Sequence, residues 1–241
     1  MAEIAKIGRM SATLDFKNPI MVIVGHWNIA ILNEPGWIAK HLLGYPEGQD
    51  IELQAIVVGN QVAQGQFSAE KQIWLFDLFG MCCNGQRLEL FARDIDNTKP
   101  LYDLIFCISE KLPHTPITGV GVNFSFQVAG DITTVAPLLE TNEALESVGM
   151  IRAMERTDSL EIVNDSLIDI PDLGRPQVSL NLARKTNFNT VDISFNYHLS
   201  LLNMDSLSKW SKVESVSHWK KHATGLMKDC YGFENIETTY F

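Results

Sequence analysis

The side chains best suited to chemistry lie on one pair of predicted strands. Residues 178–182 and 191–199 alternate apolar and polar side chains, which predicts a β-hairpin with one face toward the core. The polar face carries Asn181, Asp192, Ser194, Asn196 and His198. A histidine near a carboxylate and two amides can supply an acid and a base for a binding or hydrolytic site. The simpler alternative, which we prefer, is an antiparallel sheet that keeps one face in water.

A second set of candidate residues lies on the predicted C-terminal helix, from Ser206 to Lys228 with Asp205 as its cap. Its lysines, among them Lys220 and Lys221, make this segment locally basic. The helix presents a positive surface either to an acidic partner or to the chain's own acidic segment at about residues 140–172. Neutralisation within the chain is the more economical interpretation. Exposed ion pairs of this kind contribute about 0–1 kcal/mol each.

Two histidines on the same helix have the spacing of a metal pair. His218 and His222 are four residues apart, so both rings can face one ion. The residue after the first histidine is Trp219, where a metalloprotease places its glutamate, and two lysines follow. A solvated helix face is therefore favoured, and we predict neither a metal nor a cofactor.

The sequence contains no motif of a common enzyme class. It has no Gly-x-Ser-x-Gly elbow, phosphate loop or paired-carboxylate spacing, and its cysteines form no CxxC pair. Gly119 and Gly121 lack the third glycine of a dinucleotide fingerprint, and a strand continues where a helix would begin. We therefore lean towards a protein that is not an enzyme.

The element around which the chain is organised is a predicted central strand at residues 117–128. Its alternation places Phe124 and Phe126 with valines on one face, and small or polar residues on the other. We expect the helix before it, residues 98–112, to lie across the sheet. The two glycines would allow that helix to approach the strand closely.

Other elements follow from local signals. Residues 9–16 and 20–31 predict a hairpin turning at 17–19, and Asn33 is expected to cap a short helix that ends at Gly44. Asn84-Gly85 predicts a type I′ hairpin in which Cys83 faces Gln86. A second helical stretch is expected from Asp131 to about residue 149.

Residues 122–128 and 193–199 share one pattern of apolar, polar and aromatic residues. Each is preceded by a strand that ends in Ala-Arg, and each is followed by a predicted helix. The similarity suggests an internal duplication into halves of about 1–130 and 131–241, with chance resemblance between alternating strands as the alternative. We predict a single α+β domain spanning residues 1–241, made of mostly antiparallel hairpins with amphipathic helices on one face and a long C-terminal helix.

Composition limits the partners. The 241 residues are 46% hydrophobic, and a formal net charge of -10 would repel a phosphate backbone, so nucleic acid is not expected as a partner. No apolar run reaches the roughly 18–20 residues of a membrane-spanning helix, and the N-terminus lacks the pattern of a secretion signal. We expect no membrane partner, a cytoplasmic location and reduced cysteines.

Three segments resemble a family of sporadically distributed bacterial proteins of unknown function. They are Pro116 to Phe124 after a helix, Val191 to Phe195 before the last helix, and the ending Ala223 to Gly232. The similarity covers about the C-terminal two thirds, and Asn123-Phe124 stands where the family pattern has a more basic Arg-Tyr pair. The resemblance implies a bacterial origin and a shared fold, and brings no activity.

The function favoured by the sequence is a non-enzymatic interaction protein of a bacterial cytosolic system, acting as a homo-oligomer or as part of an assembly. The alternative is a small-molecule-binding or hydrolytic protein that uses the polar face of the 178–199 hairpin.

Overall fold

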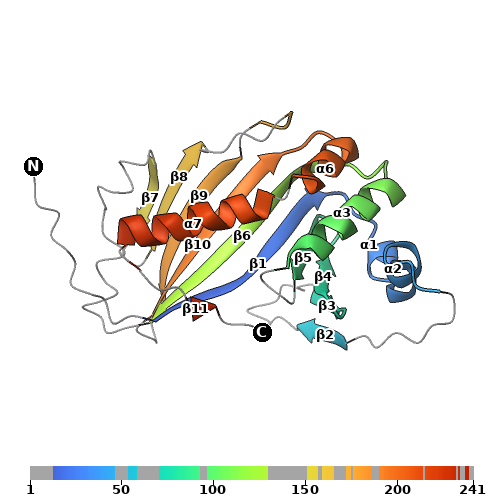
Figure 1. Ribbon diagram of the computed structural model, residues 1–241, viewed down its shortest axis with the longest axis horizontal. Coiled ribbons are helices and arrows are strands. Elements are labelled where there is room, and N and C mark those ends of the chain that lie inside the picture. Colours follow the sequence, from blue (N-terminus) through green and yellow to red (C-terminus); the bar gives the residue numbers. More distant parts are fainter. Residues whose placement is uncertain are drawn as a thin grey trace, which may run out of the picture.

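The computed structural model describes most of the chain. The described residues are 13–46, 54–58, 71–92, 97–129, 151–156, 159–165, 172–174, 176–185, 190–213, 215–231, 233 and 237–238. They form an α+β structure built on an antiparallel sheet, which confirms the predicted fold class at that level (Figure 1). The predicted helix at 131–149 and the acidic residues 140–146 lie outside the described residues, as does the start of the first predicted strand.

The sheet contains 11 strands, and ten of them follow one path. Their order is β2 (Gln54–Val58), β3 (Lys71–Leu75), β4 (Phe79–Cys83), β5 (Arg87–Ala92), β1 (Thr13–Gly25), β6 (Ile117–Ala129), β10 (Thr190–Ser200), β9 (Gln177–Lys185), β8 (Ser159–Asp165) and β7 (Ile151–Arg156). Neighbours on this path are antiparallel, and β11 (Glu237–Thr238) pairs parallel with β1. The two 13-residue strands β1 and β6 thus lie between two meanders, β2 to β5 and β7 to β10.

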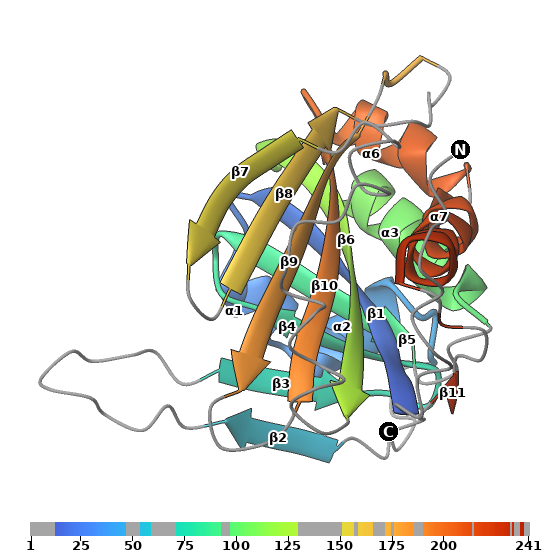
Figure 2. The same ribbon diagram turned by 90° about the vertical axis from the view of Figure 1, so that its left-hand side faces the viewer.

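Three helices cover one face of the sheet (Figure 2). They are α3 (Lys99–Lys111), α6 (Met204–Ser211) and α7 (Ser215–Tyr231), and the short α1 (Ile29–Leu32) and α2 (Pro35–His41) follow β1. Alternate residues of β6, from Val120 to Val128, are buried beneath the helices, together with Trp210 and Trp219 from α6 and α7. The predicted helix at 98–112 is confirmed, with Leu104 and Ile108 on its buried side.

The predicted N-terminal hairpin is wrong, because residues 13–25 form a single strand. Against β6, Lys17 pairs with Ser125 and Ile20 with Asn123, so Asn18 and Pro19 together oppose one residue. This is a β-bulge, which tolerates a proline because the extra residue leaves the hydrogen-bonding ladder. The turn signal at 17–19 therefore marks an irregularity within a strand.

The Asn84-Gly85 hairpin exists, but its register differs from the predicted one. Cys83 pairs with Leu88 instead of Gln86, and the two loop residues are Gly85 and Gln86. Gly85 has φ +84 at the first loop position, as in a type II′ turn. The Asn84 side chain accepts hydrogen bonds from the backbone N–H groups of Gln86 (3.2 Å) and Arg87 (2.8 Å). Asn84 therefore stabilises the turn from just outside the loop.

The single long C-terminal helix predicted from Ser206 is also wrong. The chain forms α6 and then α7, with a break after Ser211. Asn203, not Asp205, caps α6, since its side chain accepts a hydrogen bond from the Ser206 N–H at 2.9 Å. Glu34 likewise replaces the predicted Asn33 as the cap of α2.

Candidate functional site

The face of the sheet opposite α7 carries a shallow pocket of about 230 Å³. Four adjacent strands line it: β5, β1, β6 and β10. The lining residues are Val22, Val24, Arg87, Gly121, Asn123, Asn196 and His198. Two of the residues proposed from the sequence, Asn196 and His198, therefore converge with groups from three other strands that lie far away in the chain.

The strand register determines where His198 lies. His198 pairs with Gly121, and Ser200 pairs with Gly119, so the histidine ring lies above the glycine segment of β6. A Cβ atom at position 119 would come 2.6 Å from Cε1 of His198, and one at position 121 would come 2.9 Å from the Tyr197 carbonyl oxygen. The two glycines thus make room for β10 and its histidine. The expected close approach of a helix to these glycines is wrong, because the helices pack on the other face.

Amide and apolar groups complete the pocket. Asn123 and Asn196 are directly paired across β6 and β10. Val22, which is 5% exposed, and Val24 contribute the apolar part of the lining from β1. The pocket therefore combines an apolar base with hydrogen-bonding groups, as ligand sites commonly do.

Arg87 brings a positive charge to this face. Its Nη2 atom lies 3.7 Å from Oε1 of Glu89, and the two side chains are 47% and 19% exposed. This separation exceeds the 2.7–3.2 Å typical of a direct N–H···O hydrogen bond, so the contact is mainly electrostatic and is screened by solvent. Arg87 was not among the residues singled out from the sequence. Arg87 pairs with Val24 of β1, so it can be recognised as a pocket residue only when the order of β5, β1 and β6 is known.

Among the polar residues of the predicted hairpin site whose side chains the structure describes, Asp192 and Ser194 do not line the pocket. Asp192 accepts a hydrogen bond from Nε2 of Gln127 at 2.9 Å. It lies six residues from His198 on the same strand, which is roughly 20 Å in an extended chain. The backbone of Asn181 pairs with Ser194, while its side chain lies outside the described residues. The predicted acid and base pair of Asp192 and His198 is therefore not formed.

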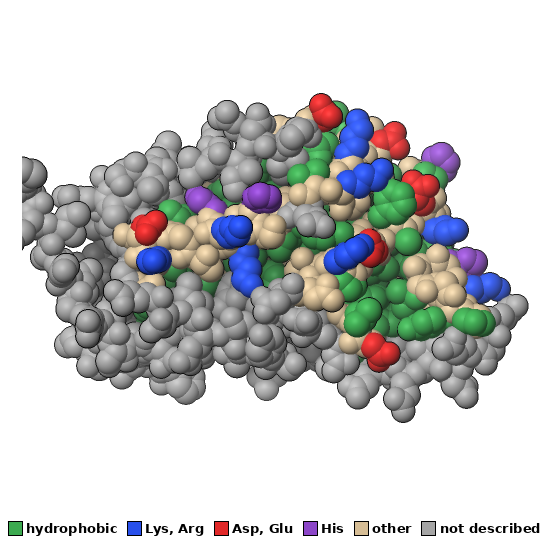
Figure 3. Space-filling view, in the orientation of Figure 1, with side chains coloured by type: hydrophobic (Ala, Val, Ile, Leu, Met, Phe, Trp, Pro, Cys, Tyr) green, Lys and Arg blue, Asp and Glu red, His purple; other side chains and the backbone are tan. Residues whose placement is uncertain are grey.

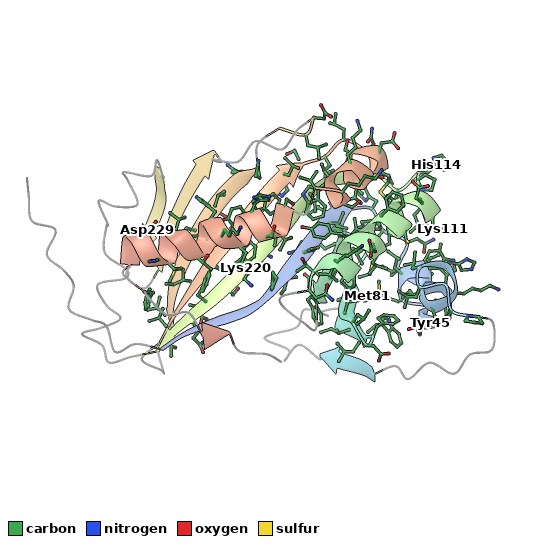
Figure 4. The ribbon with its side chains drawn as sticks, in the orientation of Figure 1. Tyr45, Met81, Lys111, His114, Lys220 and Asp229 are labelled. Atoms are coloured by element: carbon green, nitrogen blue, oxygen red, sulfur yellow. The ribbon has the colours of Figure 1, made fainter. Side chains whose placement is uncertain are left out.

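Lys220 and Lys221 lie on α7, on the other side of the sheet from His198. Figure 4 labels Lys220 on this helix, and Figure 3 shows the helix-bearing face, where the described lysine and arginine side chains are dispersed among polar and hydrophobic ones. The proposed residues whose side chains the structure describes thus belong to separate surfaces.

A buried cluster beneath α7 was not anticipated from the sequence. The Tyr197 hydroxyl lies 2.8 Å from Nδ1 of His222, and the Tyr197 ring stacks on Trp219 with centroids 5.3 Å apart. Burial raises the pKa of Tyr197 far above its ordinary value and lowers the pKa of His222. Both groups are therefore neutral near pH 7, and Nδ1 of His222 is engaged with tyrosine. Because residues 197 and 198 point to opposite faces, this cluster is separate from the pocket.

The pocket has the groups of a binding site. Among its lining residues there is no hydroxyl, thiol or carboxylate to act as a nucleophile, and His198 has no carboxylate beside it in the pocket lining. Arginine, amides and imidazole can hold a polar ligand against valine side chains. The arrangement is thus suited to recognition more than to covalent chemistry.

The fold and pocket define an α+β protein with an antiparallel sheet covered by helices on one face. Comparison with known proteins gives no matching family model and no matching curated protein. Within the described part of the chain, no helix combines the length and apolar character needed to cross a membrane.

Proposed function

We propose that this protein binds a small molecule in the pocket of the open sheet face, between β5, β1, β6 and β10. The observation that supports this proposal is the convergence of Arg87, Asn123, Asn196 and His198 above Val22. This was the alternative function considered from the sequence. A hydrolytic function is not supported, because Asp192 accepts a hydrogen bond from Gln127 and lies far from His198.

The shape of the pocket also favours a small ligand. Its volume, about 230 Å³, lies just below the roughly 300–1,000 Å³ of pockets that enclose drug-sized molecules. The floor is formed by β-strands in a continuous ladder, and such a rigid floor loses little conformational entropy when a ligand binds. A ligand of modest size can therefore be held without a large rearrangement.

Protein interaction, the function preferred from the sequence alone, remains a second candidate. It is favoured by the sheet order, because β2 and β7 are the terminal strands of the path. A terminal strand offers unpaired backbone groups to a partner strand or a second copy of the chain. Light scattering coupled to size-exclusion chromatography tests this candidate, and a strict monomer without a co-purifying protein would contradict it.

The location and origin of the protein belong to the same proposal. We retain the cytoplasmic location, the bacterial origin, the resemblance to the sporadically distributed family and the internal duplication as predictions. Cys83 and Cys107 are free thiols, which accords with a reducing compartment. The two similar strands of the predicted duplication, β6 and β10, are neighbours in the sheet. Their connections to the preceding strands differ, since α3 lies between β5 and β6 whereas only four residues lie between β9 and β10.

Blocking the pocket tests the proposal. Asn196→Trp would fill it with an indole from an exposed position of β10, without altering the core face of the strand. The matched control is Asn97→Trp, the same substitution at an exposed position before α3. Both variants and the unaltered protein are screened by ligand-observed NMR against a library of small acids, amides, amines and sugars.

We expect compounds that bind the unaltered protein and Asn97→Trp to lose binding to Asn196→Trp. Chemical-shift changes in the amide spectrum should then centre on β1, β6 and β10. The proposal is wrong if no compound binds, or if the bound compounds are retained by Asn196→Trp.

A further inference from the structure

We infer that the ligand of this pocket is a small monocarboxylate whose anionic group binds Arg87 and whose apolar body lies against Val22 and Val24. The inference rests on the proposed function and adds the chemical class of the ligand. Three properties of the site support it: the charge of its lining residues, the number of its cationic groups, and the division between its polar and apolar parts.

The first property is charge. Among the described residues that line the pocket, Arg87 is the one lysine or arginine, and none is an aspartate or glutamate. The carboxylate of Glu89 lies 3.7 Å from the Arg87 guanidinium, and Glu89 follows Arg87 by two residues on the same face of β5. A protein with a net charge of -10 gives an anion no general attraction, so anion binding must be local. A ligand carboxylate can approach the exposed guanidinium more closely than Glu89 does.

The second property is the number of cationic groups. One guanidinium presents two parallel N–H donors, which match the two oxygens of one carboxylate. Phosphate groups carry more charge and are commonly held by several cations or by backbone N–H groups at a helix N-terminus. The lining of this pocket comes from strands alone and contains one arginine. A monocarboxylate therefore fits the donor set better than a phosphate does.

The third property is the position of the apolar groups. Val24 is the direct neighbour of Arg87 across β1 and β5, and Val22 is two residues further along β1. Ile20, two residues before Val22 on β1, pairs with Asn123, which in turn pairs with Asn196. The two asparagines therefore lie on the same face as Val22, on the side away from Arg87. A ligand anchored at Arg87 therefore extends over valine before it reaches the amides. Benzoate and isovalerate have this combination of a carboxylate and a compact apolar body.

The experiment compares acids with their neutral counterparts. Dissociation constants of benzoate, isovalerate, benzamide and isovaleramide are measured by protein-observed NMR titration at constant ionic strength. We expect the acids to bind about tenfold more tightly than the amides, in line with a charge-assisted hydrogen bond that is partly exposed to water. Arg87→Gln should remove this preference, and Lys111→Gln, which removes a positive charge from an exposed position of α3, should leave it intact.

Glu89→Gln gives a change in the opposite direction. Removing the carboxylate near Arg87 should tighten benzoate binding several-fold and leave benzamide binding unchanged, because only the anion is repelled by Glu89. A purely structural effect of substitutions in β5 would weaken both ligands. This arm also remains informative if Arg87→Gln does not fold.

The outcomes separate the inference from the function on which it rests. If the amides bind as well as the acids, and Asn196→Trp abolishes binding of both, the pocket binds small molecules but the carboxylate inference is overturned. The inference is also overturned if Arg87→Gln keeps the preference for acids. If neither the acids, the amides nor any library compound binds at the pocket, both the inference and the proposed function fail.

Discussion

Replacing Gly119 with alanine tests the packing of His198 over β6. An ideal Cβ at this position would lie 2.6 Å from Cε1 of His198 and 3.0 Å from the carbonyl oxygen of Leu199. The first contact is with a side chain that can move, whereas the second is with the backbone of the adjacent strand. The substitution should therefore displace the His198 ring and strain the β6/β10 ladder.

The expected loss of stability combines two opposing terms. Overpacking a tight site costs about 1–3 kcal/mol. Replacing glycine also lowers the conformational entropy of the unfolded chain, which stabilises the folded state by about 0.4–1 kcal/mol. We expect Gly119→Ala to lower the free energy of unfolding by about 1–2 kcal/mol, which corresponds to a melting temperature lower by roughly 2–8 °C for a protein of this size.

Urea unfolding of a double-mutant cycle isolates the contact with the histidine. In the Gly119→Ala/His198→Ala protein the ring is gone, so the glycine substitution should cost at least about 1 kcal/mol less than it does alone. Gly225→Ala is the matched control, since a Cβ at this position of α7 meets no atom within 4 Å. It should stabilise the protein by up to about 1 kcal/mol, as alanine is the better helix former. A neutral Gly119→Ala, or a cycle without coupling, would refute the packing of His198 over this glycine.

Two further predictions concern buried groups. Because burial lowers the folded-state pKa of His222 below its unfolded value near 6.5, the unfolded state binds more protons, and stability should decrease as the pH falls from 8 through 6.5 toward the folded pKa. Thermal unfolding of His222→Phe should show a weaker pH dependence than that of His218→Phe, which alters an exposed position, and equal dependence in both would contradict the assignment. Burial raises the pKa of the Cys83 thiol, with a smaller opposing effect of its backbone hydrogen bond to Gly85. Iodoacetamide at pH 8 should therefore modify the half-buried Cys107 before Cys83, and peptide mass spectrometry showing the reverse order would refute this.

Local patterns in the sequence were sufficient for several elements. The alternation in residues 117–128 predicted β6 and its buried face, and the apolar spacing in 98–112 predicted α3, because both signals arise from residues close in the chain. The signal at 17–19 misled because a proline is compatible with a turn and with a bulge, and only the partner strand distinguishes them. Ser211 and Ser215, on either side of the break between α6 and α7, are buried.

The candidate site could be predicted only in part, for a topological reason. Asn196 and His198 were recognisable as polar residues on one face of a single hairpin. Arg87, Val22 and Asn123 belong to strands that become neighbours of β10 only through the order β5-β1-β6-β10. The same order makes the two similar segments, β6 and β10, neighbours in the sheet. They are antiparallel partners in which Asn123 pairs with Asn196 and Ser125 with Ser194, so their matching patterns face the same surfaces.

The central position of β1 has a consequence for folding during synthesis. This strand precedes its partners along the chain, since β5 and β6 begin at Arg87 and Ile117, and β11 begins at Glu237. The contacts of β1 thus span most of the described chain, and such long-range pairing slows folding. A nascent chain that ends before Ile117 carries β1 without the strand that covers most of its length, and its exposed edge favours aggregation. Supplying chaperones during expression should therefore increase the folded yield of the 241-residue chain, because they can cover the exposed edge of β1 until β6 has been made.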